Sequence, residues 1–402
     1  KGLSILIESS TSPTFYRQIS QIKKRYPAST IHKYTPVNRD SLYEGLSAAS
    51  GQSIVSGHAF DKADIIVSFD SDFLNGEPGN VVSSKEFSTR RDPDSSTSLN
   101  RLYSIESTFT VTGSTADHRI AVSSGHVEGA LWIIANAIIK KLPSSQVSSS
   151  IKSLVKEGAH KYQSLISDDI VSAIASDLIA NKGRSILIAG DRQPASVHSL
   201  IYWLNDVLKN AGSTVMYRPR PLRDHSIVTD SHMDSITNLL KRIHKKQVKT
   251  LVILGGNPAF NTPGNLQFAA QLSTIENTVH VTSHANDTTA LCQWGVPRHH
   301  YLESWSDTKG LDGSVSIVQP LIEPLYEGLS DISALSILLN RKRSDYALVR
   351  QTWRFLSPGT AFTSSLKRWL NTGVIHGATP ANTSDVSQVA AIRGAVHRSV
   401  KR

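Results

Sequence analysis

Cysteine is nearly absent from this sequence, since Cys292 is the only one in 402 residues. One cysteine excludes an intrachain disulfide framework, and it excludes a four-cysteine iron–sulfur site or a cysteine-rich zinc site built by this chain alone. No stretch approaches about 18 uninterrupted apolar residues, so no helix of this sequence is expected to span a membrane. The patterns HExxH, GxSxG, GxxxxGKS/T and GxGxxG are also missing. Cys292 itself lies in an apolar neighbourhood and is expected to be buried and unreactive.

Positive charge is in excess, but it is concentrated at one end. The chain has 43 Lys and Arg against 33 Asp and Glu, a net charge of +10. Residues 341–402 contain eleven basic and two acidic residues, so residues 1–340 are left with only +1. A nucleic-acid binder is expected to carry a basic face on its folded body, so this class is disfavoured. The basic segment is either a solvated tail or a site for an acidic partner or anionic lipid head groups.

The length predicts more than one domain, because single hydrophobic cores stop growing near about 250–300 residues. Consecutive Ile, Val and Leu residues are typical of strands that are covered on both faces in parallel sheets. The predicted strands are Ser4–Ile7, Ile65–Phe69, Leu102–Ile105, Arg119–Val122, Ser185–Ala189, Thr214–Tyr217, Thr250–Leu254 and Thr278–Thr282. The predicted helices are Phe15–Arg25, Val127–Lys140, Asp168–Asn181, Ser196–Asn210, Asp234–Lys245 and Pro263–Leu272. This alternation predicts an α/β, doubly wound fold.

Composition also predicts connectors and ends. Residues 143–150 are rich in serine and 92–98 and 218–230 are polar, so all three are expected to be loops. Residues 371–387 lack periodicity and are expected to be irregular. The chain begins directly with an apolar strand and stops without a finishing element, which is expected of a piece of a longer protein.

Two segments share one layout, a buried strand followed by a polar loop. Ala63–Asp72 ends in Asp70-Ser71-Asp72, and Lys249–Pro258 ends in Gly255-Gly256-Asn257-Pro258. Ligands of open α/β sheets bind beyond the carboxyl ends of strands, so these loops are the first candidate sites. The glycines of the second loop allow the backbone to approach a ligand and its amides to face phosphate, although a tight turn would need the same residues. Asp70 and Asp72 suit a metal or a ribose, or an ordinary acidic turn.

Other polar groups have weaker patterns. Asp117-His118-Arg119 and His299-His300 have no nucleophile or second metal ligand at a supporting spacing, so structural roles are expected. The basic run Lys241–Lys246 ends a predicted helix, where cations are favourable, and it is expected to be a solvated face.

Taken together, several blocks resemble the large subunit of molybdopterin oxidoreductases, and most of all the molybdopterin-like domain in the iron–sulfur subunit of bacterial alternative complex III, a quinol-oxidising respiratory assembly. The resemblance covers about residues 3–345. The blocks that carry it are Ala63–Asp70, Ala116–Gly125, Gly255–Pro258, Asn286–Leu291 followed by Gly295–Pro297, His300–Asp307, Asp312-Gly313 and Gln319–Tyr326.

The resemblance implies two doubly wound, mostly parallel-sheet α/β domains, the second inserted in the first. Residues 1–178 would rejoin 298–345, residues 179–297 would be the insert, and 346–402 would be a basic, partly irregular segment. The family's N-terminal cluster-binding domain and C-terminal barrel are not in this sequence. In catalytic relatives the guanosine ends of a bis-molybdopterin guanine dinucleotide lie on the two loops. The cofactor-binding candidates are therefore Asp70, Ser71, Asp72, Gly255, Gly256, Asn257, Pro258, Asn286, Asp287, Thr288 and Glu303.

The sequence departs from the catalytic members at two places. The first loop is Phe69-Asp70-Ser71-Asp72 rather than GxNP, and no cysteine occurs in Asn38–Ser47, where relatives carry a metal ligand. Ser41 or Ser47 could be offered as the ligand, but neither lies in a matching motif. No catalytic or metal-binding residue is therefore identified, and an enzymatic activity is left open.

Three functions follow as hypotheses. The first is a cofactor-free scaffold in a respiratory electron-transfer subunit, with iron–sulfur clusters outside this chain. Its partners would be other subunits of a membrane-bound redox complex, on the periplasmic face of a bacterial inner membrane, and not nucleic acid. The second is an active oxidoreductase of the polysulfide-reductase or hydrogenase-annotated type, with molybdenum or tungsten bound by the pterins and by solvent or serine. The third is a nucleotide-binding or protein-interaction α/β module.

Overall fold

The computed structural model describes residues 2–94, 98–162, 165–220, 231–310 and 312–375, which form two compact units. Unit 1 contains the described residues of 1–38 and 221–379, and unit 2 those of 39–220. One unit is thus inserted in the other, as expected. The insert, however, is 39–220 rather than 179–297, so the predicted boundaries at 178/179 and 297/298 do not coincide with this division.

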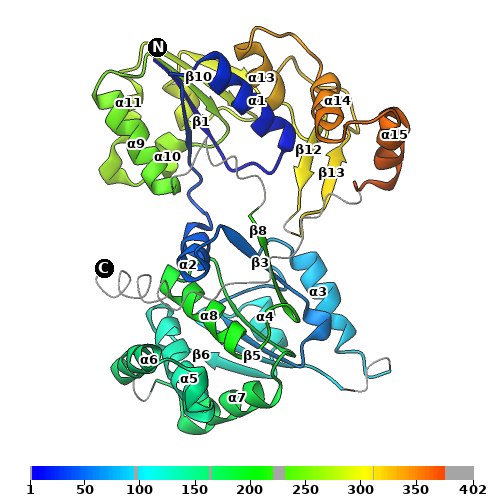
Figure 1. The fold of residues 1–402 in the computed structure, drawn as a ribbon. Helices are drawn as coiled ribbons and strands as arrows, with labels where there is room; N and C mark the ends of the chain where they lie inside the picture. Colours follow the sequence, from blue (N-terminus) through cyan, green and yellow to red (C-terminus); the bar gives the residue numbers. More distant parts are fainter. Residues whose placement is uncertain (1, 95–97, 163–164, 221–230, 311, 376–402) are drawn as a thin grey trace. The chain divides into compact units, whose positions relative to one another are not determined.

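Unit 1 is built on a parallel sheet of five strands in the order β11-β10-β9-β1-β2 (Figure 1). The strands are β1 (Leu3–Ile7), β2 (Thr30–Lys33), β9 (Thr250–Leu254), β10 (Asn277–Thr282) and β11 (Trp294–Pro297). Its helices are α1 (Pro13–Arg25), α9 (His232–His244), α10 (Pro258–Asn261), α11 (Phe268–Leu272), α12 (Asp287–Ala290), α13 (Asp331–Leu338), α14 (Asp345–Leu356) and α15 (Phe362–Thr372), with a 3₁₀ turn at Gly264–Leu266. A hairpin of β12 (Ser306–Lys309) and β13 (Val315–Val318) completes it.

Alternation along the strands gives this sheet two buried faces. Ile5 and Ile7 pack into a core with residues of α1, α13, α14, α15 and the hairpin. Leu6, between them, packs into a second core with α9 and α11. Successive side chains of a strand point to opposite faces of the sheet. A strand whose consecutive residues are all apolar therefore needs helices that cover both faces.

Unit 2 contains a parallel sheet of four strands in the order β6-β5-β4-β7. The strands are β4 (Ile65–Phe69), β5 (Arg101–Glu106), β6 (His118–Ala121) and β7 (Ser185–Ala189), and a separate antiparallel pair joins β3 (Ile54–His58) and β8 (Val215–Pro219). The helices are α2 (Asp40–Ser50), α3 (Asn80–Thr89), α4 (Val111–Thr115), α5 (Val127–Lys141), α6 (Ser149–Lys161), α7 (Asp168–Ala180) and α8 (Ala195–Val207). Three 3₁₀ turns lie at Phe60–Lys62, Ser124–His126 and Ser144–Gln146.

Strand pairing explains why the predicted domain boundaries were wrong. β7 pairs with β4, although 179–297 was expected to fold separately from 1–178. β9 pairs with β1 in the same way, across the whole insert. Such long-range pairing depends on which buried strands become neighbours, which local composition does not encode.

Three local predictions were also wrong or incomplete. The helix predicted at 263–272 is a 3₁₀ turn and a short helix, separated by Gln267 with φ of 50°. The serine-rich segment 143–150 is not a loop throughout, because Ser148 caps α6 through the amide of Ile151. Residues 371–375 complete α15 and the turn after it, whereas 376–387 and 221–230 lie outside the described residues. Within the described ranges, no helix is long and apolar enough to cross a membrane.

Candidate functional site

Both candidate loops follow strands at the point where the order of strand addition reverses, so that the next strand is added on the other side of the sheet. In unit 2 the chain runs outward from β4 to β5 and β6, and then returns to place β7 on the other side of β4. In unit 1 it runs from β1 to β2 and returns to place β9 on the other side of β1. The ends of β4 and β7, and those of β1 and β9, are thus the topological switch points, where ligands of such sheets bind.

The switch point of unit 2 is closed by backbone contact. Asp70 follows β4 with φ of 55°, and its amide donates to the carbonyl of Ile105 over 2.8 Å. The amide of Gly190, just after β7, donates to the carbonyl of Phe69 over 3.0 Å. A Cβ atom on Gly190 would lie 2.0 Å from the carbonyl oxygen of Asp70. The residues after β4 and β7 therefore lie in direct backbone contact at this switch point.

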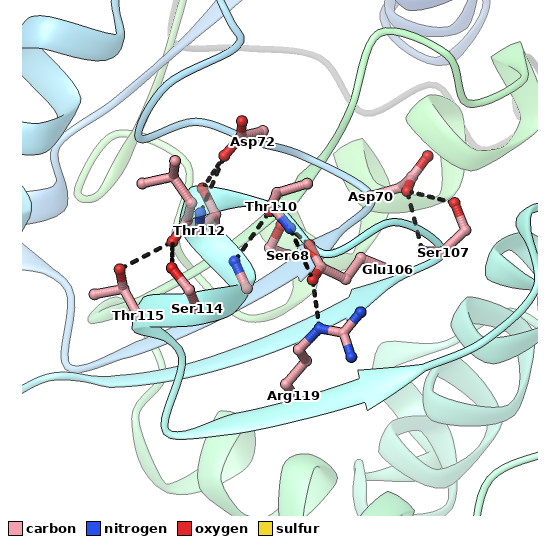
Figure 2. Close-up of polar contacts among 12 residues, drawn as sticks. Ser68, Asp70, Asp72, Glu106, Ser107, Thr110, Thr112, Ser114, Thr115 and Arg119 are labelled. Atoms are coloured by element: carbon pink, nitrogen blue, oxygen red, sulfur yellow. Dashed lines mark hydrogen bonds and ion pairs between the residues drawn. The ribbon is translucent and has the colours of Figure 1, made fainter.

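The carboxylate of Asp70 is buried and bound from both sides. One oxygen accepts from the amide and hydroxyl of Ser107 at 3.4 and 3.3 Å (Figure 2). The other accepts from the Nε2 of Gln193 at 3.2 Å. Asp70 is only 8% exposed. Both carboxylate oxygens of Asp70 thus accept hydrogen bonds from the protein itself, as expected of a structural acid.

Asp72 and Ser71 also make hydrogen bonds within unit 2. Asp72 accepts from the amide and hydroxyl of Thr112 at 3.0 and 2.9 Å, which ties the loop to α4 (Figure 2). Ser71 is 2% exposed, and its carbonyl accepts from the hydroxyl of Ser68 at 2.9 Å. The buried Ser71 hydroxyl faces Glu77, and its hydrogen bond lowers the pKa of that acid against the effect of burial.

Glu106, which was not selected from the sequence, is the most buried acid of this region. It ends β5 at 1% exposure and accepts from the Nε of Arg119 at 2.6 Å and from the hydroxyl of Thr110 at 2.6 Å (Figure 2). A Cβ atom on Gly113 would lie 1.8 Å from its carboxylate, so only glycine fits there. The available signal was an acid at the end of a buried strand, since such a position requires a partner.

A further acid of unit 2 has a shifted pKa. Burial, together with repulsion from Asp191, raises the pKa of Glu77 from an ordinary 4.5 to about 7. Asp191 is paired with the Nε of Arg39 at 2.8 Å. Asp70, Asp72, Glu77 and Asp191 give this loop cluster an acidic character that disfavours phosphate.

In unit 1, Glu8 covers the switch point. It follows β1 and lies above the turn after β9, where a Cβ atom on Gly255 would be 2.1 Å from its carboxylate oxygen. Arg298 lies beside it, 3.5 Å from Glu8 and 2.5 Å from Asp331. Burial raises the pKa of Asp331, and Arg298 opposes that shift. Gly255 and Gly256 have φ of 76° and 71°, which explains the two glycines.

The second loop is joined to the segment after β10 by side-chain hydrogen bonds. The Oδ1 of Asn257 accepts from the amide and hydroxyl of Thr288 at 3.1 and 2.8 Å. Its Nδ2 donates to Asp287 at 2.9 Å. Asn286 caps α12 and donates to the carbonyl of Gly256 at 3.3 Å. Pro258 begins α10, where its missing N–H costs nothing.

Glu303 has a local role. Its carboxylate accepts from the amides of His300 and Leu325 at 2.7 and 3.2 Å, and these bonds lower its pKa. It thus joins two turns of unit 1. A cavity of about 310 Å³ lies nearby in that unit, lined by Ser12, Arg298, His300, Trp305 and Asp331 among others.

The remaining candidates are structural, as expected. Asp117 is paired with Arg91 at 2.5 Å and accepts from the amide of Leu102 at 2.7 Å, and these interactions lower its pKa despite partial burial. The ring of His118 stacks on Tyr103 at 4.9 Å. Partial burial raises the pKa of the Cys292 thiol. Among the described residues, no group of three or more His, Cys, Asp or Glu side chains could hold a metal ion.

Comparison with solved structures defines the class of fold. Acetylene hydratase from Pelobacter acetylenicus superposes with a TM-score of 0.69 at 10% identity, over 94% of this chain and 60% of that one. The formyltransferase/hydrolase complex FhcABCD from Methylorubrum extorquens matches with a TM-score of 0.51 at 11% identity, over 87% of this chain and 92% of that one. No family model and no curated protein matches the sequence.

These likenesses establish the fold. The chain therefore has a mostly parallel α/β fold similar to that of acetylene hydratase. The chain spans only about 60% of the acetylene hydratase chain.

Proposed function

We propose that this chain is the molybdopterin-oxidoreductase-like part of a respiratory iron–sulfur subunit of the alternative complex III type, and that it works as a scaffold without the molybdenum cofactor. The family-like blocks of the sequence and the fold support the first half of the proposal. Its role is to hold cluster-bearing domains and partner subunits in place for electron transfer.

The contact between Asp70 and Gly190 carries the second half. A dinucleotide at a switch point needs an open crevice and amides that are free to bind its phosphates. Here the backbones of Asp70 and Gly190 lie in close contact, and the acids of the loop accept bonds from their own unit, which supports the absence of a dinucleotide. Burying phosphates beside Asp70, Asp72 and Glu77 would add repulsion between like charges.

The residues present also do not fit the metal of that cofactor. The segment Asn38–Ser47, where relatives supply a ligand, is largely helix α2, which buries Leu42 and Leu46 in the core. Ser47 lies on the exposed side of that helix, and Cys292 belongs to unit 1, in another part of the sequence. No step of chemistry is therefore assigned to these residues.

Metal analysis of the full-length protein from a cofactor-competent host tests this proposal. We expect no stoichiometric molybdenum or tungsten, and no pterin fluorescence after oxidation. About one metal per chain would overturn it and would make the protein an enzyme.

A second candidate is supported by the unit 1 loop alone. Gly255 and Gly256 keep the backbone of a phosphate-binding turn at a switch point, next to Asn257. A guanine nucleotide bound there would raise the midpoint of thermal unfolding. We expect GDP to give no shift, because Glu8 covers Gly255.

An exposed apolar strip on unit 1 supports docking to partner subunits. Leu321, Leu325 and Tyr326 are 77%, 68% and 80% exposed, and Tyr301 beside them is 65% exposed. The amide of Leu321 donates to the carbonyl of Leu302, which places Tyr301 next to this segment. Contiguous apolar surface of this kind is typical of interaction sites. The proposed complex is membrane-bound and periplasmic, and co-purification of the native protein with membrane subunits tests that placement.

A further inference from the structure

Two segments of unit 1 contain no acidic residue at all. Residues 9–38 hold five Lys and Arg and no Asp or Glu. Residues 235–275 hold five Lys and Arg and again no Asp or Glu. Although the net charge of residues 1–340 is near zero, positive charge without acidic residues is therefore concentrated in these two segments.

The fold brings these two segments together around a groove. Its volume is about 460 Å³, and its cations come from the last turns of α1 and α9 and the residue after α9, namely Lys23, Lys241, Arg242 and Lys245. Ile31 and His32 of β2 line it as well. β2 ends the order of its sheet, so the groove runs along an edge strand. Among the residues that the structure describes, none that lines the groove is acidic.

The groove lies at the amino edge of the sheet, away from the switch point. α1 leads into β2 and α9 leads into β9, so both helices end near the beginnings of strands. The Gly255 turn follows the other end of β9. The groove is thus a separate feature, independent of the proposed absence of the cofactor.

The preference of cations for helix C-termini does not by itself explain why these cations line one groove. Cations are favourable at a helix C-terminus, but only by about 0.3–1 kcal/mol each. Lys23 is held in place by the carbonyls of Ser29 and Pro27, at 2.5 and 3.3 Å. The Nε of Arg242 is buried without a hydrogen-bond partner among the described residues. This donor is available to an acceptor that enters the groove.

We propose that this basic groove binds an extended acidic segment of a partner polypeptide. Edge strands are common docking sites for extended chains, and the cations would select carboxylates. A lipid surface is disfavoured, because the lining includes no exposed Trp, Phe or Leu to anchor in a bilayer. Single-stranded nucleic acid is disfavoured, because the lining described by the structure has no Phe, Tyr or Trp for base stacking and its one ring, that of His32, is buried.

Fluorescence anisotropy of the full chain tests this proposal with a fluorescein-labelled decapeptide of alternating Glu and Val. The control peptide carries Gln in place of Glu. The test variant is Lys241→Glu with Lys245→Glu. Its matched control is Lys140→Glu with Lys156→Glu, which changes net charge equally on exposed positions of α5 and α6. We expect the acidic peptide alone to bind, with about tenfold weaker binding in the test variant and less than about a twofold change in the control.

Two further binding experiments distinguish a lipid surface and a nucleic acid from an acidic polypeptide. We expect vesicles of phosphatidylcholine with phosphatidylglycerol, and a single-stranded oligonucleotide, to bind equally weakly to test and control variants. Binding of either that is lost only in the test variant would overturn the polypeptide assignment, as would equal loss of peptide binding in both variants. If charge reversal unfolds α9, Lys241→Gln with Lys245→Gln is expected to weaken peptide binding about fivefold, and unchanged binding would overturn the proposal.

Discussion

The carbonyl oxygen of Asp70 lies so close to Gly190 that a Cβ atom at position 190 would approach it to 2.0 Å. This relationship joins the ends of β4 and β7 and closes the switch point of unit 2. We expect Gly190→Ala to lower the free energy of unfolding by about 3 kcal/mol, because backbone must move on one side. Urea unfolding followed by circular dichroism measures the loss.

A glycine in open space provides the control for that substitution. Nothing lies within 4 Å of a Cβ atom on Gly125, which belongs to the same unit. Gly125→Ala is expected to change stability by less than about 1 kcal/mol. Equal effects of the two substitutions would show that the Asp70–Gly190 contact is not tight in solution.

Glu77 makes the stability of unit 2 depend on pH. Because burial and Asp191 raise its pKa from 4.5 to about 7, the folded state binds more protons than the unfolded state between these values. Stability from this group is therefore full below about pH 4.5 and falls as the pH rises through 7. We expect Glu77→Gln to stabilise the protein by about 1–3 kcal/mol at pH 8 and to have little effect at pH 4.5.

The measurement is the difference in the free energy of unfolding between Glu77→Gln and the parent protein, taken from about pH 4.5 to about pH 8. His198 acts in the opposite direction, since burial lowers its pKa from 6.5 to about 4 and stability is lost as the pH falls through that window. The difference curve cancels this contribution. A flat difference from pH 4.5 to 8 would rule out a raised pKa at Glu77.

The sequence predicted the fold class and most central elements, because buried strands and amphipathic helices have local signatures. All eight predicted strands overlap observed ones, while β2, β3, β11, β12 and β13 were missed. β2 is Thr-Ile-His-Lys, a short edge strand with one large aliphatic residue, so its pairing with β1 decides its structure.

The site was predictable only in part. Asp70, Asp72 and Asn257 were selected because they follow buried strands. Glu8, Glu106 and Gly190 were not selected, since their importance depends on contacts across the fold, such as that of Glu8 with Gly255. The basic groove was missed for the same reason, because a net charge summed along the chain ignores which segments become neighbours.

Arg119 is expected to stabilise unit 2 mainly by neutralising Glu106. The guanidinium is 2.6 Å from a carboxylate whose side chain is 2% exposed. Arg119→Leu leaves that charge buried beside Thr110, and we expect a loss of about 2–3 kcal/mol. Adding Glu106→Gln is expected to restore about 1 kcal/mol.

An exposed pair serves as the comparison. Arg101 and Asp177 lie 2.6 Å apart with side chains 50% and 26% exposed. Arg101→Leu is expected to cost about 0.5 kcal/mol. If Arg119→Leu cost no more than this, Glu106 would have to be neutralised by another group.

Asn257 and Asp287 offer a test of whether the second loop is held by its own contacts. The amide of Asn257 donates to Asp287 at 2.9 Å, so Asn257→Asp places two carboxylates together and is expected to cost about 1 kcal/mol. Adding Asp287→Asn reverses the pair and restores a donor opposite an acceptor. We therefore expect the double variant to regain most of the loss, measured as the midpoint of thermal unfolding. Failure of this rescue would mean that the Asn257 amide has a second role at the switch point, as ligand binding requires, and would favour the nucleotide-binding candidate over the scaffold.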